Sequence, residues 1–121
     1  MALLTLKFVT NVRDLDYAAV EFHGELDQST LGNTEKEIAE FFEAFKRKFL
    51  VFDLANLGFI NSEGIGFLVS THMKLLKRGQ KLILCGLKRN VEDVIQLIGL
   101  PKLIPVFSTM SAAIDHMKQI T

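Results

Sequence analysis

The sequence predicts a single α/β domain, residues 1–121, with a mostly parallel central sheet, an N-terminal antiparallel hairpin and about four helices. Two short, nearly continuous apolar runs, 49–54 and 82–85, are typical of central strands buried on both faces. Segments with apolar residues at helical spacing precede and follow these runs. Strands that alternate with helices in this way imply right-handed crossovers and parallel pairing. The length also suits one domain of this kind.

The hairpin is predicted from two segments in which apolar and polar residues alternate, Leu4 to Phe8 and Ala18 to Phe22. A polar connection from Asn11 to Asp16 joins them. The first helix is expected from about Thr34 to Lys48, because apolar residues recur there at helical spacing. Thr34 followed by Glu37 matches a capping box at its start.

The second helix is expected to follow a polar loop, residues 55–61, and to end near Arg78 with Gly79 as its C-cap. That loop follows the first buried strand, and a turn at residues 24–30 follows the second strand of the hairpin. Functional residues of parallel sheets gather at the carboxyl ends of the strands. We therefore expect both segments to contribute to a functional site.

The last third of the chain continues the alternation of helices and strands. A helix over residues 91–98 is expected to stop at Gly99 and Pro101. A short strand near Ile104 to Phe107 follows, and Ser108 is the expected N-cap of a final helix. The predicted order is ββαβαβαβα.

Charge and composition argue against several classes of protein. Lysine and arginine together number 14 and so do aspartate and glutamate, whereas nucleic-acid binders usually carry a basic excess. We interpret the basic groups 46–48 and 77–78 as solvated cations near helix ends. No run of about 20 apolar residues predicts a membrane span. Cys85 is the single cysteine, and no secretory signal begins the chain, so a cytoplasmic location is expected.

Catalytic and metal-binding patterns are not evident. His23, His72 and His116 are isolated and have no cysteine at the spacing of a zinc site. His72 falls on the apolar stripe of its helix, where we expect a partly buried, hydrogen-bonded side chain. The sequence has no nucleophile elbow, P-loop or dinucleotide-binding turn. We therefore expect no metal, no cofactor and no enzymatic activity.

The most informative segment runs from Leu54 to Leu68, where a buried strand leads through a polar turn into a helix. Ser62 occupies the expected N-cap position, beside the free N–H groups of a helix start, where a phosphate could be held. Gly64 and Gly66 lie inside the helix, where glycine costs about 1 kcal/mol relative to alanine. They therefore indicate a close approach of the helix to the sheet or to a docking partner.

Two motifs in the chain resemble the STAS domain, the fold of anti-sigma-factor antagonists and of the cytoplasmic tails of sulfate transporters. Residues 59–66, F-I-N-S-E-G-I-G, are similar to the family pattern aromatic, apolar, Asp, Ser, Ser or Ala, Gly, Leu, Gly. Residues 24–27, G-E-L-D, are similar to the family's turn after the second strand. The resemblance implies an antagonist that sequesters an anti-sigma factor with serine kinase activity. That kinase would phosphorylate Ser62, and a PP2C-type phosphatase would reset the cycle.

The resemblance also implies which residues contact the partner: Asp27, Asn61, Ser62, Glu63, Gly64 and Gly66. Asp27 could instead serve only as a turn-stabilising cap. Two positions depart from the family pattern, because Asn61 replaces an aspartate and Glu63 replaces a small residue. The Glu63 carboxylate would repel an incoming phosphate, so phosphorylation could be slower, shorter-lived or absent.

Two other functions are weighed against the antagonist. A STAS domain could be an accessory subunit of a lipid or anion transporter, or part of a stress-signalling complex that works without phosphorylation. A flavodoxin-like domain that binds a small ligand or acts as an enzyme is a third reading. The missing phosphate-binding glycine turn argues against that third reading.

Overall fold

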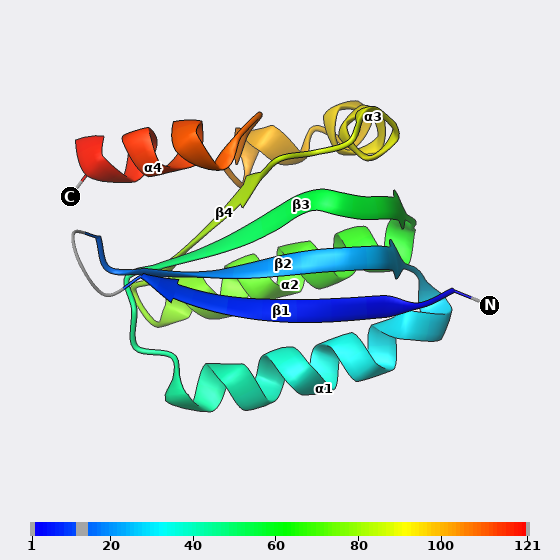
Figure 1. The fold of residues 1–121 in the computed structure, drawn as a ribbon, viewed down its shortest axis with the longest axis horizontal. Helices are drawn as coiled ribbons and strands as arrows, with labels where there is room; N and C mark the ends of the chain where they lie inside the picture. Colours follow the sequence, from blue (N-terminus) through cyan, green and yellow to red (C-terminus); the bar gives the residue numbers. More distant parts are fainter. Residues whose placement is uncertain (1, 12–14, 121) are drawn as a thin grey trace.

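The computed structural model describes residues 2–11 and 15–120 and shows alternating strands and helices (Figure 1). Its elements are β1 (Leu4–Asn11), β2 (Tyr17–Leu26), α1 (Gln28–Ala44), β3 (Phe49–Ile60), α2 (Ser62–Lys77), β4 (Lys81–Cys85), α3 (Arg89–Ile98), the 3₁₀ helix η1 (Leu100–Lys102), β5 (Val106–Phe107) and α4 (Met110–Gln119). Residues 12–14, the middle of the expected connection from Asn11 to Asp16, lie outside the described residues.

The strands form one sheet in the order β1-β2-β3-β4-β5. Strand β1 is antiparallel to β2, and the other pairs are parallel. Strand β3 lies at the centre and β4 has a neighbour on each side, so the predicted fold class and the two predicted central strands are confirmed. No helix in the described part of the chain is long and apolar enough to cross a membrane.

Side-chain alternation along the strands creates two cores. Even-numbered residues such as Phe22, Leu50 and Phe52 face the main core, which helices α1 and α2 cover. Odd-numbered residues such as Val51 and Ile83 face α4 on the other side of the sheet (Figure 1). Helix α3 packs beside β3 and adds to the main core. Burial on both faces explains why β3 and β4 read as continuous apolar runs.

Strands β2 and β3 are longer than the sequence indicates. The expected loop 55–61 is strand as far as Ile60, and residues 24–26 of the expected turn also belong to a strand. Both expectations were wrong because β2 and β3 continue to pair, with Leu26 opposite Ile60, through two register irregularities. Gly24 lies at one of them with φ of 131°, and a Cβ there would collide with the Leu3 carbonyl. Glycine is therefore the residue that fits this position.

Helix α1 begins six residues earlier than expected, because Asp27 and not Thr34 caps it. The Asp27 carboxylate accepts the Ser29 N–H, and the Thr30 hydroxyl accepts the Asp27 N–H, which together form a capping box. Thr34 is a buried interior residue whose hydroxyl donates to the Thr30 carbonyl. Helix α1 also ends earlier, at Ala44, so residues 46–48 lie in the following loop and not in a last helical turn.

The other helix ends lie close to their predicted positions. Thr109, one residue after the expected Ser108, caps α4 by accepting the Ala112 N–H. Arg78 is the C-cap of α2, and Gly79 follows it with φ of 72°. Gly99 ends α3 in the left-handed conformation, as predicted.

Candidate functional site

The start of α2 is the centre of the predicted site, and its cap is Asn61. The Asn61 Oδ1 accepts the Gly64 N–H at 3.0 Å, and the Asn61 carbonyl accepts the Ile65 N–H at 3.0 Å. Ser62 is therefore the first residue of the helix and not its N-cap, which corrects the sequence-based prediction. Asparagine and serine cap helices equally well, so the pattern alone did not distinguish them.

Because Asn61 caps the helix, Ser62 is left available. Its side chain is exposed and makes no hydrogen bond within the described residues. The cap occupies the N–H groups of Gly64 and Ile65, which leaves those of Ser62 and Glu63 at the helix start. A helix N-terminus with free N–H groups favours an anion, so a phosphate on Ser62 would find donors nearby.

The two glycines of α2 serve different purposes. A Cβ on Gly64 would lie 2.6 Å from Ile60 Cγ1, 3.0 Å from Leu26 Cγ and 3.1 Å from the Leu26 carbonyl oxygen. A Cβ on Gly66 would meet no atom within 4 Å. The predicted close approach to the sheet is therefore confirmed at Gly64, whereas Gly66 faces open space on the outside of the helix.

Asp27 and Ser62 follow neighbouring strand ends and lie close together. The Asn61 N–H donates to the Leu26 carbonyl at 3.3 Å. Asp27 follows Leu26 and Ser62 follows Asn61, so each of them lies one residue beyond this hydrogen bond. The Asp27 carboxylate also accepts the Ser29 hydroxyl at 2.7 Å. Hydrogen bonds from Ser29 lower the pKa of Asp27. Asp27 is therefore a helix cap, which is one of its two predicted roles, and its contact with a partner remains a prediction.

Two neighbours of the site were not singled out as functional residues. The Asn90 side-chain amide donates to the Gly58 carbonyl at 2.7 Å, which ties the start of α3 to the end of β3. No sequence signal indicates this bond, since it joins residues 32 positions apart. Phe59 is 43% exposed at the same sheet edge and adds an apolar side chain to a polar surface. From the sequence, Phe59 is part of a motif and is not predicted to contact a partner.

No group of three potential metal ligands lies together in the part of the chain that the structure describes. His23 Nε2 lies 3.1 Å from Glu21 Oε1, and both residues belong to β2. His72 is 5% exposed, and its Nδ1 has no hydrogen-bond partner within the described residues, contrary to the expectation of a hydrogen-bonded side chain. Burial, and then the positive charge of Lys81, lower the pKa of His72.

Comparison with known proteins gives consistent matches. The family model of the STAS domain matches residues 7–113. The anti-sigma F factor antagonist of Paenibacillus polymyxa is 22% identical over 102 residues, which cover 84% of this chain and 87% of that protein. The crystal structure of an anti-sigma factor antagonist from Mycobacterium paratuberculosis has a TM-score of 0.79 at 23% identity, covering 98% of this chain and 95% of that one. The phosphorylated form of the Bacillus cell fate determinant SpoIIAA has a TM-score of 0.64 at 20% identity, covering 94% of this chain and 98% of that one.

Proposed function

Because this chain belongs to the STAS domain family, we propose that it is an anti-sigma factor antagonist, a regulatory protein without catalytic activity of its own. It binds an anti-sigma factor through the edge where β2 and β3 end and α2 begins. The antagonists among its relatives and structural neighbours support this function. We infer that the chain works in the cytoplasm, where sigma factors act.

The observation that carries the proposal is the free hydroxyl of Ser62 at the exposed start of α2. The anti-sigma factor, acting as a serine kinase, phosphorylates this hydroxyl, and a PP2C-type phosphatase removes the phosphate. The phosphate adds about −1.5 to −2 charges at neutral pH. Since Asn61 holds the helix cap, Ser62 can be modified without loss of a structural hydrogen bond.

The outer face of α2 suits close docking. Ser62, Gly66 and Ser70 follow one another at intervals of four residues, so they lie on one face of the helix, and all three are exposed. Gly66 has open space where a side chain would stand. A partner backbone can therefore approach the helix closely, and the phosphate on Ser62 would stand at one end of the contact.

Glu63 adjusts the strength of the switch. Its carboxylate is exposed next to Ser62, and it favours the positive end of the helix dipole. The same charge repels a phosphate on Ser62. We therefore expect Glu63→Ser to raise the rate or the extent of Ser62 phosphorylation by the partner.

The test is a titration against the anti-sigma factor, which a pull-down with the unmodified protein and mass spectrometry would identify. Ser62→Ala should bind within a few-fold of the wild type, whereas Ser62→Asp should bind at least about ten-fold more weakly, because an unpaired buried charge costs several kcal/mol. Ser111→Asp is the matched control, since Ser111 is an exposed serine in the first turn of α4. It should bind like the wild type.

Two results would overturn the proposal. Equal affinities of Ser62→Ala and Ser62→Asp, with no phosphate on Ser62 after incubation with the partner and ATP, would leave no switch at this serine. Recovery of a membrane transporter in place of an anti-sigma factor would instead favour the accessory-subunit function.

A further inference from the structure

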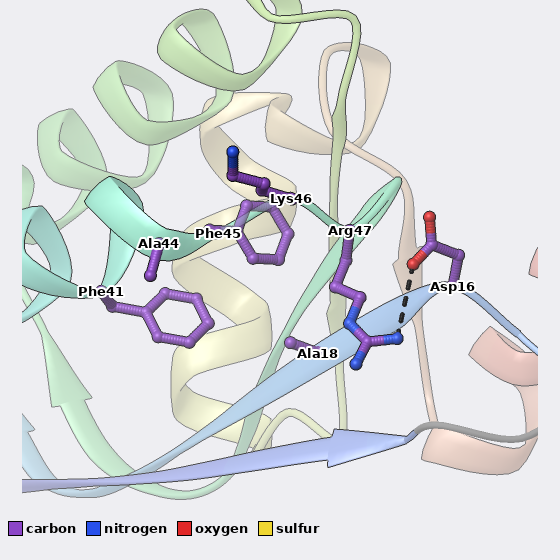
Figure 2. Close-up of a pocket in the computed structure, with 7 residues that line it drawn as sticks. All are labelled: Asp16, Ala18, Phe41, Ala44, Phe45, Lys46 and Arg47. Carbon is purple, nitrogen blue, oxygen red and sulfur yellow. Dashed lines mark ion pairs between the residues drawn. The ribbon is translucent and has the colours of Figure 1, made fainter.

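A cavity of about 560 Å³ lies near the start of β2 (Figure 2), whereas Ser62 follows the opposite end of the neighbouring strand β3 (Figure 1). It is bounded by the last turn of α1, the loop that follows it and the start of β2. Pockets that bind small molecules usually measure about 300–1,000 Å³ and combine apolar walls with a few polar groups. For the basic residues of this loop, the sequence predicts only solvated cations.

The inner wall of the cavity is apolar. Figure 2 shows Phe41, Phe45, Ala18 and Ala44 around the same space. The ring centroids of Phe41 and Phe45 are 5.3 Å apart, and Phe8 stacks on Phe41 at 4.9 Å. Ala18 is fully buried and Ala44 is exposed, and neither side chain is large enough to fill the volume beside these rings. An apolar ligand can therefore enter without displacing a core side chain.

The rim of the cavity carries more positive than negative charge. Arg47 Nη1 lies 3.6 Å from Asp16 Oδ1, and the exposed Lys46 also lines the cavity, with its ammonium on the other side of Phe45 and directed away from this ion pair (Figure 2). The two side chains of the ion pair are 34% and 54% exposed. An exposed ion pair of this length contributes little stability. The Asp16 carboxylate also accepts the Lys48 N–H at 3.0 Å, so it keeps a hydrogen-bond partner when the Arg47 guanidinium turns to a ligand carboxylate.

The end of α1 is held in place by a residue from another helix. The Arg78 guanidinium donates to the carbonyls of Phe42 and Phe45. The Phe42 carbonyl also accepts the Phe45 N–H, so the Arg78 bonds add to the existing cap and tie the end of α1 to α2. The backbone at Phe45 is therefore held in place and its ring is buried, so the cavity wall does not have to form when a ligand arrives.

We propose that this cavity binds a single-chain anionic amphiphile. The alkyl chain lies against Phe41 and Phe45, the carboxylate pairs with Arg47, and Lys46 adds positive charge to the lining. Apolar walls exclude a purely polar anion, and the net positive rim disfavours a cationic amphiphile. This site is independent of the proposed docking surface, since it lies at the other end of the strands.

Calorimetric titration with octanoate, decanoate and dodecanoate, each below its micelle concentration, tests the proposal. Affinity should rise about two- to four-fold for each added methylene that the cavity buries. Acetate should give no heat of binding. Dodecyltrimethylammonium should bind at least about ten-fold more weakly than dodecanoate. A series with no dependence on chain length, or equal binding of the cation, would overturn the proposal.

Two variants separate the apolar wall from the charged rim. Ala44→Trp should fill the cavity and weaken dodecanoate at least about ten-fold, and the control Ala39→Trp, an exposed position of the same helix, should not. Arg47→Gln should remove the preference for carboxylate over trimethylammonium but keep the dependence on chain length. Lys102→Gln, in η1, is its control and should change neither.

A last measurement distinguishes the free amphiphile from a lipid surface. Co-sedimentation with vesicles of an anionic phospholipid should be no greater for the wild type than for Ala44→Trp. Binding to vesicles without binding of free dodecanoate would show surface electrostatics in place of a ligand site. That result would overturn the proposal, because it is obtained with the wild type and does not depend on whether the variants fold.

Discussion

Replacing Gly64 and Gly66 by alanine, one at a time, tests why one helix contains two glycines. Each alanine should gain up to about 1 kcal/mol from its better helix propensity. At Gly66 nothing opposes this gain, because the new Cβ enters open space. At Gly64 the Cβ would overlap Ile60 Cγ1 at 2.6 Å and press on Leu26, and overpacking of this kind costs about 1–3 kcal/mol. The neighbouring atoms are the Ile60 Cγ1 methylene, the Leu26 branch carbon and a backbone oxygen, none of which is the free end of a flexible side chain, so they cannot move aside cheaply.

The gain from helix propensity is the same in both variants, so it cancels in the difference between their free energies of unfolding. We therefore expect Gly64→Ala to be about 1–3 kcal/mol less stable than Gly66→Ala, which for a chain of this size means about 3–15 °C in Tm. Urea denaturation followed by circular dichroism measures this difference directly. Equal stability of the two variants would refute the close approach of α2 to β2 and β3. A titration would add a second contrast, since Gly66→Ala should bind the proposed anti-sigma factor partner more weakly although it is the more stable protein.

Asn61→Ala should lower the free energy of unfolding by about 1 kcal/mol, whereas Ser62→Ala should change it by less than about 0.5 kcal/mol; equal losses in urea titrations would contradict the cap at Asn61. Because burial, reinforced by Lys81, lowers the pKa of His72 in the folded state, the unfolded chain takes up a proton more readily. The free energy of unfolding should therefore fall as the pH drops below about 6.5. Denaturation curves of His72→Leu over the same pH range should show a smaller fall, and a fall equal to that of the wild type would exclude His72 as its source. Burial raises the pKa of the Cys85 thiol to about 12, so native protein at about pH 8 should resist a maleimide; labelling faster than unfolding would contradict this.

The parts of the fold that were predictable from sequence are those in which burial determines the pattern. Residues 49–54 and 82–85 are apolar on both sides because helices cover both faces of the sheet there. The second half of β3 was not predictable in this way. Asn56 and Gly58 read as a loop, since this part of the strand pairs with β2 alone and exposes several side chains.

The start of α1 shows a second limit. Residues 28–33 include Ser29, Gly32 and Asn33, which favour turns over helices by local propensity. The capping box between Asp27 and Thr30 outweighs that propensity. At the site, the motif located the right junction, but the choice between Asn61 and Ser62 as the cap depended on backbone angles that no residue type encodes.

The pairing of Leu26 with Ile60 has a kinetic consequence. Both halves of the candidate docking surface are attached to adjacent strands of the sheet, so their relative position is set before any partner arrives. Binding to such a surface spends little conformational entropy on ordering a loop. Association should then be limited by diffusion and charge, and a change at Ser62 should act mainly on the rate at which the complex dissociates.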